Sequence, residues 1–288
     1  MERNTAKRTL EKLLSVCICL CMLGAMLPAQ VFAEEADTAQ TETVQDTAPK
    51  DTVYLSSADD LIQLAKDCRL DSWSQNRTVV LEADIDLSSV DFNGIPSFGG
   101  TWEGQNHAIT GLSLSQDGSV QGLFRYVQQG ALVRDMTVKG RIKPGGTRAS
   151  VGGIAGSNAG TIENCAFDGV VSGTSQIGGI AGVNTVKGSI NGCAVSGTVY
   201  GSHFVGGVVG QNDGVAANCT NAASVNTTVS QNEVKLNDLT LDNVLKTEKA
   251  NDVTDAGGIA GNNAGVLRAC INRGTIGYSH IGYYVGGG

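Results

Sequence analysis

The sequence contains few aromatic and few charged residues. Phe, Trp and Tyr together make up 5% of its 288 residues, and Asp, Glu, Lys and Arg make up 17%. A hydrophobic core therefore cannot be built around large rings, and small and β-branched side chains must fill it, as they do in regular β structure. Histidine is also scarce, and none of His107, His203 and His280 is followed by Glu. The His-Glu-x-x-His motif of zinc peptidases is thus absent from the sequence.

Glycine, by contrast, is abundant. The 39 glycines amount to about twice the usual share of roughly 7%. They do not follow a Gly-X-Y period, which excludes a collagen triple helix. They also do not stand at a strand-to-helix junction, where a phosphate-binding loop would place them.

The first 33 residues have the pattern of a Sec signal peptide. A segment with four basic residues precedes an apolar run from Leu13 to Leu27, and Val31 and Ala33 provide the residues that a cleavage site requires. A membrane anchor is the alternative, but the run is shorter than the roughly 20 residues of a spanning helix. We predict cleavage after Ala33 and a secreted or cell-surface protein of bacterial type.

The net charge of the chain also limits its partners. The charge is −8, and cleavage would remove four positive and two negative charges to leave −10. An acidic chain repels phosphate backbones and anionic headgroups, so we expect no nucleic-acid partner and no membrane insertion after signal cleavage. Residues 34–50 are acidic and nearly free of large apolar residues, which predicts a disordered leader.

A six-residue unit recurs along the chain. It spans Val151–Gly156 and returns at Ile177–Gly182, Val205–Gly210 and Ala256–Gly261, with a fifth copy that begins at Val285. The second glycines of successive copies lie 26, 28, 51 and 29 residues apart. With three short apolar segments per repeat, this period predicts an all-β, right-handed parallel β-helix with three strands in each coil. The interval of 51 residues predicts an insertion at about residues 226–254.

Other residues keep the register of this unit. Ile162, Ile190, Ala216 and Leu267 align, and three residues after each stands a cysteine: Cys165, Cys193, Cys219 and Cys270. Met136 takes the cysteine position in an earlier, degenerate copy. Equivalent residues of a β-helix stack about 4.8 Å apart, so both sets predict columns that face the core. We expect the Gly-Gly pair at one corner, for a positive φ or a close backbone approach, and Asn164 and Asn218 at another.

The four periodic cysteines allow three interpretations. A zinc site needs convergent thiolates at spacings such as Cys-x₂₋₄-Cys, whereas these cysteines lie 28, 26 and 51 residues apart. A disulfide between neighbouring coils is allowed by distance, but stacked side chains seldom reach the required dihedral angle. We favour a column of buried free thiols that act as small hydrophobic residues, and we predict no metal and no cofactor.

Residues 51–121 are expected to form an N-terminal cap and the first coil. We predict a short helix over Tyr54–Arg69. Ser57 and Asp60 resemble a capping box, and the residues that follow form an apolar face: Leu61, Ile62, Ala65 and Cys68. Residues Thr78–Leu87 alternate as a strand. A helix across the first coil would cover its apolar core and unpaired edges. Residues 122–288 are expected to form the repeats, truncated at the C-terminus because the fifth copy stops at Gly288.

Four linked segments resemble secreted bacterial GLUG-repeat proteins. They are Leu81-Glu-Ala-Asp-Ile-Asp-Leu87, Phe98-Gly-Gly-Thr-Trp-Glu-Gly-Gln-Asn-His-Ala-Ile-Thr-Gly-Leu112, and the repeats from Gly153 to Cys165 and from Gly207 to Cys219. The resemblance covers roughly residues 52 to 288. The family includes N-terminal, non-catalytic regions of M26-type IgA peptidases and filamentous haemagglutinin-like adhesins. It therefore implies a β-helix and an extracellular location, but no single activity.

The sequence offers no set of catalytic residues. A β-helix lyase or hydrolase needs carboxylates from the same face of successive coils, but Asp168 aligns with Ser196, Ala222 and Arg273. Asp213 is similarly isolated, and lone aspartates at turns mostly form the turn itself. His107 belongs to the family phrase and is expected to pack rather than react. We therefore predict no catalytic, cofactor-binding or metal-binding residues, and no enzymatic activity in this chain.

The sequence thus predicts a non-catalytic extracellular scaffold for cell-surface adhesion or partner binding. The partner would be an extracellular protein or glycan. The alternative is an N-terminal accessory region of a larger secreted M26-like zinc metallopeptidase or carbohydrate-active enzyme, whose catalytic part would lie beyond residue 288. The insertion is expected to form either a folded flap on the solenoid wall or a protrusion that binds a partner.

Overall fold

The computed structural model describes residues 50–146, 149–227, 255–277 and 285–286. These residues belong to one compact unit, Ala48–Gly288. The expected signal peptide at 1–33, the leader up to residue 49 and most of the expected insertion, 228–254, lie outside the described residues.

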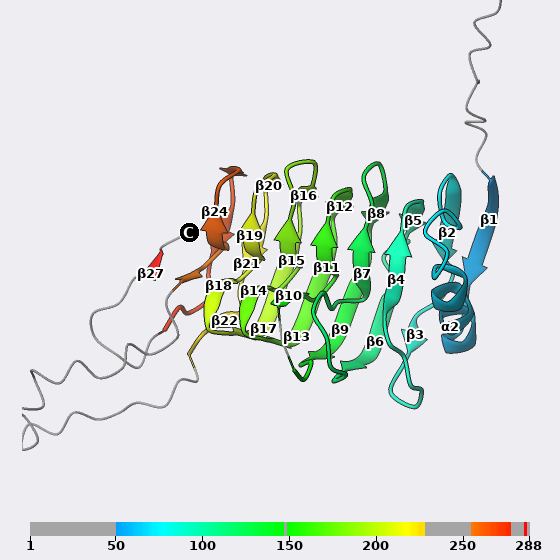
Figure 1. Ribbon diagram of the computed structural model, residues 1–288, viewed down its shortest axis with the longest axis horizontal. Coiled ribbons are helices and arrows are strands. Elements are labelled where there is room, and N and C mark those ends of the chain that lie inside the picture. The colour runs from blue at the N-terminus through cyan, green and yellow to red at the C-terminus, as the bar shows by residue number, and fades with distance from the viewer. Residues whose placement is uncertain (1–49, 147–148, 228–254, 278–284, 287–288) are drawn as a thin grey trace, which may run out of the picture. The chain divides into compact units, whose positions relative to one another are not determined.

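The described chain is a parallel β-solenoid with one short helix near its N-terminal end, as the sequence predicts. Strands of successive coils lie side by side and pair in parallel (Figure 1). We name the four sheets A to D. Sheet A contains β1 (Lys50–Leu55), β2 (Arg77–Leu81), β5 (Thr101–Glu103), β8 (Leu132–Arg134), β12 (Thr161–Glu163), β16 (Ser189–Asn191), β20 (Val215–Ala217) and β25 (Val266–Arg268). Sheet B contains β3 (Ile85–Asp86), β6 (Ala108–Leu114), β9 (Thr137–Ile142), β13 (Ala166–Ser172), β17 (Ala194–Tyr200), β21 (Thr220–Asn221), β22 (Ser224–Val225) and β26 (Ile271–Asn272).

The other two sheets complete each coil. Sheet C contains β4 (Ile95–Phe98), β7 (Phe124–Val127), β11 (Ala155–Asn158), β15 (Ala181–Asn184), β19 (Val209–Asn212) and β24 (Ala260–Asn263). Sheet D contains β10 (Ala149–Gly152), β14 (Ser175–Gly178), β18 (His203–Gly206), β23 (Ala256–Gly257) and β27 (Val285–Gly286). A full coil such as β10 to β13 therefore has four strands, and the expectation of three was wrong.

The extra strand arises at the second glycine of each Gly-Gly pair. Strand β10 ends at Gly152, and β11 begins at Ala155 after a bend at Gly153 and Ile154. A Cβ on Gly153 would lie 2.3 Å from Cγ of Phe167, so only glycine allows this sharp corner. The expected close backbone approach is thus present, whereas neither glycine of the pair has a positive φ.

The coils stack in the register that the sequence predicts. Ile162 pairs with Ile190, which pairs with Ala216, and that residue pairs with Leu267. A second corner has left-handed backbone, with φ of 51° at Asn164 and 56° at Asn218, as expected. Asn tolerates this conformation better than most other residues.

Helix α2 (Ala58–Asp67) is shorter than expected. Tyr54 and Leu55 belong to β1, because they pair in parallel with Val80 and Leu81 of the next coil. The helix begins with the capping contacts that the sequence predicts. Ser57 Oγ accepts a hydrogen bond from the backbone N–H of Asp60 at 3.2 Å and donates one to the Asp60 carboxylate at 2.8 Å. The hydrogen bond from the Ser57 side chain has the largest effect in lowering the pKa of Asp60, and the backbone hydrogen bond from Ser56 adds to it.

The expected strand at residues 78–87 is split into β2 and β3. The break is a corner between sheets A and B, where the carboxylate of Asp84 accepts hydrogen bonds from the backbone N–H of Ala108 and from the ring of His107. At this corner the Asp84 side chain, and not its backbone, accepts the N–H of the next coil, so the regular strand pairing is interrupted there.

The core changes in character along the solenoid. Phe98, Trp102 and Phe124 form a cluster of edge-to-face and tilted rings in the first coils, with ring centroids 5.2–6.0 Å apart. Later coils contain mainly buried Ile, Val, Ala and Cys side chains. The scarce aromatic residues are thus concentrated where the solenoid begins.

A ladder of buried asparagines joins the coils at the corner between sheets C and A. Asn158, Asn184 and Asn212 are completely buried, and each donates a side-chain N–H to the Oδ1 of the next, the last to Asn263, at 2.7–2.8 Å. Each of these three also donates to backbone carbonyls of its own turn and the next coil, such as Gly188 and Val215 for Asn184. Buried amide groups are therefore satisfied across successive coils.

Substitution of Asn184 by Ala is expected to destabilise the solenoid by about 2–3 kcal/mol, because it removes the acceptor of one Asn158 hydrogen bond and the donor to the buried Oδ1 of Asn212 and to the carbonyls of Gly188 and Val215. The free energy of unfolding in urea measures the effect. Lys187→Ala, an exposed change in the same turn, is the control and should cost little. Equal stability of the two variants would contradict the ladder's role.

Candidate functional site

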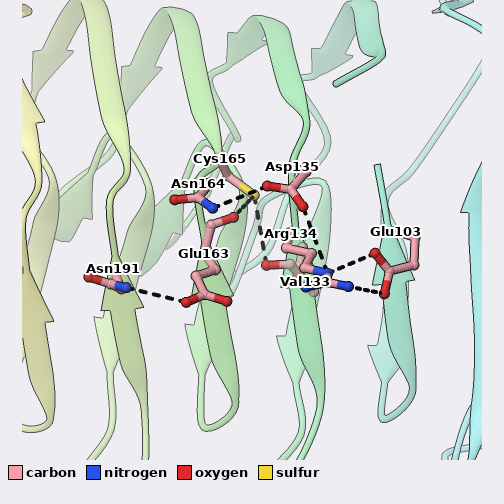
Figure 2. Close-up of polar contacts among 8 residues, drawn as sticks. All are labelled: Glu103, Val133, Arg134, Asp135, Glu163, Asn164, Cys165 and Asn191. Atoms are coloured by element: carbon pink, nitrogen blue, oxygen red, sulfur yellow. Dashed lines mark hydrogen bonds and ion pairs between the residues drawn. The ribbon is translucent and has the colours of Figure 1, made fainter. Parts of the chain in front are cut away.

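A row of polar side chains runs along sheet A and the left-handed corner next to it. We call it the polar ribbon, and it consists of Glu103, Arg134, Asp135, Glu163, Asn164, Asn191 and Asn218. Sheet A provides four of these residues, at equivalent positions of β5, β8, β12 and β16. The other three lie at the corner that follows sheet A. Figure 2 shows how the side chains of neighbouring coils point toward one another.

One half of the polar ribbon is organised around Arg134. Its Nε and Nη2 donate to the two carboxylate oxygens of Glu103 at 2.7 and 2.9 Å (Figure 2). Nε also lies 3.7 Å from Oδ2 of Asp135. The hydrogen bonds and charge of Glu103 raise the pKa of Arg134, so the guanidinium stays charged. A bidentate contact of this kind fixes both side chains in one geometry.

Amide groups extend the row to the following coils. Asn164 donates to Oδ1 of Asp135 at 3.2 Å, and Asn191 donates to Oε1 of Glu163 at 3.3 Å (Figure 2). Asn218 then donates to Oδ1 of Asn191 at 2.8 Å. Each contact joins neighbouring coils, so the spacing of donors and acceptors follows the spacing of the coils.

The polar ribbon presents ordered hydrogen-bonding groups to solvent. Its side chains are partly or fully accessible to solvent, yet their mutual contacts hold them in place. It has three carboxylates and one guanidinium, and its amides can both donate and accept hydrogen bonds. An extended ligand with many hydroxyl groups would find matching partners along several coils without ordering flexible side chains first.

The cysteine column lies inside the solenoid, as predicted. Cys165, Cys193 and Cys219 are buried and Cys270 is partly exposed, and all four are free thiols, as is Cys68. Sγ of Cys165 donates to the backbone carbonyl of Glu163 at 3.2 Å (Figure 2). Burial raises the pKa of Cys165 to about 12, which keeps the thiol protonated and unreactive. Met136 is also buried, in the place that the register assigns to it.

The histidines and aspartates considered in the sequence lie in separate local contacts. His107 Nδ1 lies 3.0 Å from Asp84, a surface contact rather than the expected packing, because a carboxylate at the neighbouring corner faces its ring. Asp168 accepts from Ser196, and Asp213 accepts from Gln211. His203 lies 3.6 Å from Asp255, and His280 lies outside the described residues.

The described residues contain neither a cluster of metal ligands nor a membrane-spanning helix. Within residues 50–146, 149–227 and 255–277, no three His, Cys, Asp or Glu side chains are arranged to hold a metal ion. The helix in this part of the chain is too short and too polar to cross a membrane.

Comparisons with known proteins give limited similarity. No family model matches the chain. The chain is 29% identical over 128 residues to halomucin of Haloquadratum walsbyi, an alignment that covers 38% of this chain and 1% of halomucin. It thus spans a very small part of that protein's length. A solved structure of a Bacteroides ovatus protein, provisionally described as an immunoglobulin A1 protease, has a TM-score of 0.48 and 18% identity, with 81% of this chain and 82% of that chain covered. The resemblance to GLUG-repeat proteins stays a prediction.

Sequence reasoning missed the polar ribbon and the asparagine ladder. Ladder residues occur five positions after the second glycine of every repeat, as in Gly179 and Asn184, so a signal was present. The sheet A positions of the polar ribbon carried no such signal, because their residue type changes from coil to coil. Only the register of the structure shows that Glu103 and Arg134 are neighbours.

The buried thiols predict how stability depends on pH. The pKa of Cys165 is raised to about 12, whereas an unfolded thiol titrates near about 8.5. A raised pKa contributes stability that is complete below the unfolded value and is lost as the pH rises toward the folded value. We expect the free energy of unfolding to fall between about pH 8.5 and 12, by up to about 1.4 kcal/mol per pH unit for each such thiol.

Cys165→Ala should reduce this fall when urea unfolding is compared at a neutral and an alkaline pH. Val171→Ala is the matched control, because it also shortens a completely buried side chain but removes no titrating group. The same pH dependence in both variants would show that Cys165 does not titrate in this way.

Proposed function

We propose that the chain is a secreted, non-catalytic scaffold that binds a neutral glycan through the polar ribbon and so serves in cell-surface adhesion. The observation that carries this proposal is the pair of adjacent side-chain contact series, one from Glu103 to Asn164 and one from Glu163 to Asn218. The series presents donors and acceptors at a regular spacing across neighbouring coils.

The composition of the polar ribbon favours a glycan over a protein surface. Protein interfaces derive most of their affinity from buried aromatic and Arg side chains in well-packed pockets. The polar ribbon has no aromatic residue. Its Arg134 already donates two hydrogen bonds to the carboxylate of Glu103. Sugar hydroxyls can both donate and accept, and therefore suit carboxylates and amides that are held in place.

Two further parts of the proposal rest on the sequence and on residue placement. Secretion is inferred from the pattern of residues 1–33. The lack of catalysis is inferred from the placement of Asp168, Asp213 and His107, each of which contacts a different local partner. A hydrolytic pair of carboxylates would need to flank one bond of the substrate.

The test measures binding of the purified protein to three immobilised neutral polysaccharides: a glucan, a mannan and a galactan. We expect binding to at least one of them, and we expect Glu163→Ala with Asn191→Ala to weaken it about tenfold, which corresponds to about 1.4 kcal/mol. Circular dichroism checks that the variant keeps its fold.

The matched control is Asp168→Ala with Ser196→Ala. These residues also form a hydrogen-bonded acid and polar pair on β13 and β17, the same two coils, but on sheet B. The control should bind as the unchanged protein does. The proposal fails if none of the three polysaccharides binds, or if the control pair weakens binding as much as the ribbon pair does.

A further inference from the structure

A groove lies between helix α2 and the beginning of sheet C. One cavity of about 290 Å³ is lined by Ile62, Lys66 and Arg69 of the helical segment and by Asp91, Pro96 and Arg125 of the solenoid, among others. A second cavity, of about 470 Å³, shares Pro96 and Arg125 and continues past Tyr126. Their volumes fall near or within the range of about 300–1,000 Å³ that is typical of small-molecule sites.

The groove follows from the way the helix covers the sheet. Strand β4 is the edge strand of sheet C, and Pro96 suits an edge because it has no N–H to donate to a further strand. Helix α2 lies next to β4 (Figure 1). A helix placed beside a strand cannot continue the sheet, so space is left between the two elements.

Three basic residues line this groove against two acidic ones, Asp91 in the first cavity and Asp71 in the second, so its charge is positive although the chain as a whole is acidic. Lys66, Arg69 and Arg125 line the first cavity with one carboxylate, Asp91. None of these four residues takes part in an ion pair with another described residue. An anion that enters the first cavity therefore meets an excess of positive charge that no carboxylate of the described residues neutralises in an ion pair.

Arg125 is held in a fixed position. Its Nε donates to the backbone carbonyl of Val120 at 3.1 Å, and its Nη2 donates to that of Ser119 at 3.3 Å. The guanidinium is thus ordered before a ligand binds, which lowers the entropic cost of binding. Lys66 and Arg69 are exposed on the other side of the cavity.

The second cavity adds an apolar surface of the kind that a sugar ring contacts. Tyr126 is 47% exposed at its rim, beside Pro96. The wall behind it is fixed, because Gln128 donates to the carbonyl of Asp71 and to Oγ of Ser97, both at 2.7 Å. An exposed aromatic ring with a polar tip accommodates ligands that are apolar on one face and polar at the edge.

We propose that this groove binds an acidic saccharide, a hexuronate unit of a glycan. Its carboxylate lies among Lys66, Arg69 and Arg125, and the adjoining sugar ring lies against Pro96 and Tyr126. The site is separate from the polar ribbon, and its ligand differs in charge from the neutral glycan proposed there.

Calorimetric titration of the purified protein with trigalacturonate tests the proposal. We expect binding that weakens as salt is raised, because the contacts are charged and exposed. The fully methyl-esterified trisaccharide keeps the rings but loses the carboxylates, and it should bind at least about tenfold more weakly. Inorganic sulfate alone should also bind more weakly, because it offers no ring to Tyr126.

The variant Lys66→Gln with Arg69→Gln should lower the affinity for trigalacturonate about tenfold. Lys139→Gln with Arg141→Gln is the matched control, because it removes the same charge from two exposed residues of β9 on sheet B. The proposal is overturned if trigalacturonate does not bind at millimolar concentration, if the ester or sulfate binds equally well, or if both variant pairs have the same effect. The Lys66 and Arg69 variant should bind neutral polysaccharides as the unchanged protein does. A failure of the groove proposal can thus be distinguished from a failure of the proposal for the polar ribbon.

Discussion

Buried side-chain amides link the four consecutive coils that contain Asn158, Asn184, Asn212 and Asn263, and they constrain how these coils stack. The amide of Asn184 accepts a hydrogen bond from Asn158 and donates one to Asn212, and it can do so only when three successive coils are in register. A slip of one residue would leave several completely buried polar groups without partners, at a cost of about 1–3 kcal/mol each. The constraint still allows coils of different length. Between Asn184 and Gly188 the chain makes a turn two residues longer than that between Asn158 and Gly160, and both asparagines still bond the carbonyl of the glycine.

The surface sites depend on this register. Glu103 and Arg134 lie 31 residues apart in the sequence. They form a bidentate pair only because their strands, β5 and β8, are adjacent and aligned. The same holds for Asn191 and Glu163 on the next coils. The polar ribbon is therefore a property of the stacked coils rather than of any single segment, and loss of one ladder asparagine should disturb it from inside. The groove beside α2 has a different origin, since it forms at the first strand of sheet C, where a helix lies beside the edge of the sheet.

The sequence predicts the apolar and cysteine columns of the repeats, but it does not show the bend at the Gly-Gly pair or the asparagine ladder, although both recur. Columns such as Ile162 with Ile190, or Cys165 with Cys193, carry the same or a similar residue at each turn, so alignment of the repeats places them correctly. The number of strands per coil was wrong, because a two-residue bend at Gly153 and Ile154 divides one apolar segment into two strands.

The candidate sites show the same limit. The ribbon residues differ in type from one coil to the next, and the groove brings Lys66 of a helix next to Arg125 of the second strand in sheet C. Neither arrangement has a period that sequence reasoning could detect. Local signals did succeed where one turn of chain decides the structure, as at the Ser57 cap and the left-handed Asn164.

Hydrogen exchange of asparagine side-chain amides tests the central claim most directly. In NMR spectra of the protein with labelled asparagine, the Nδ2 protons of Asn158, Asn184 and Asn212 should exchange far more slowly than those of exposed Asn93 and Asn106, because the ladder amides are buried and bonded. Exchange of the ladder amides as fast as that of the exposed ones would contradict the account, because it would show that the coils are not held in register by these groups.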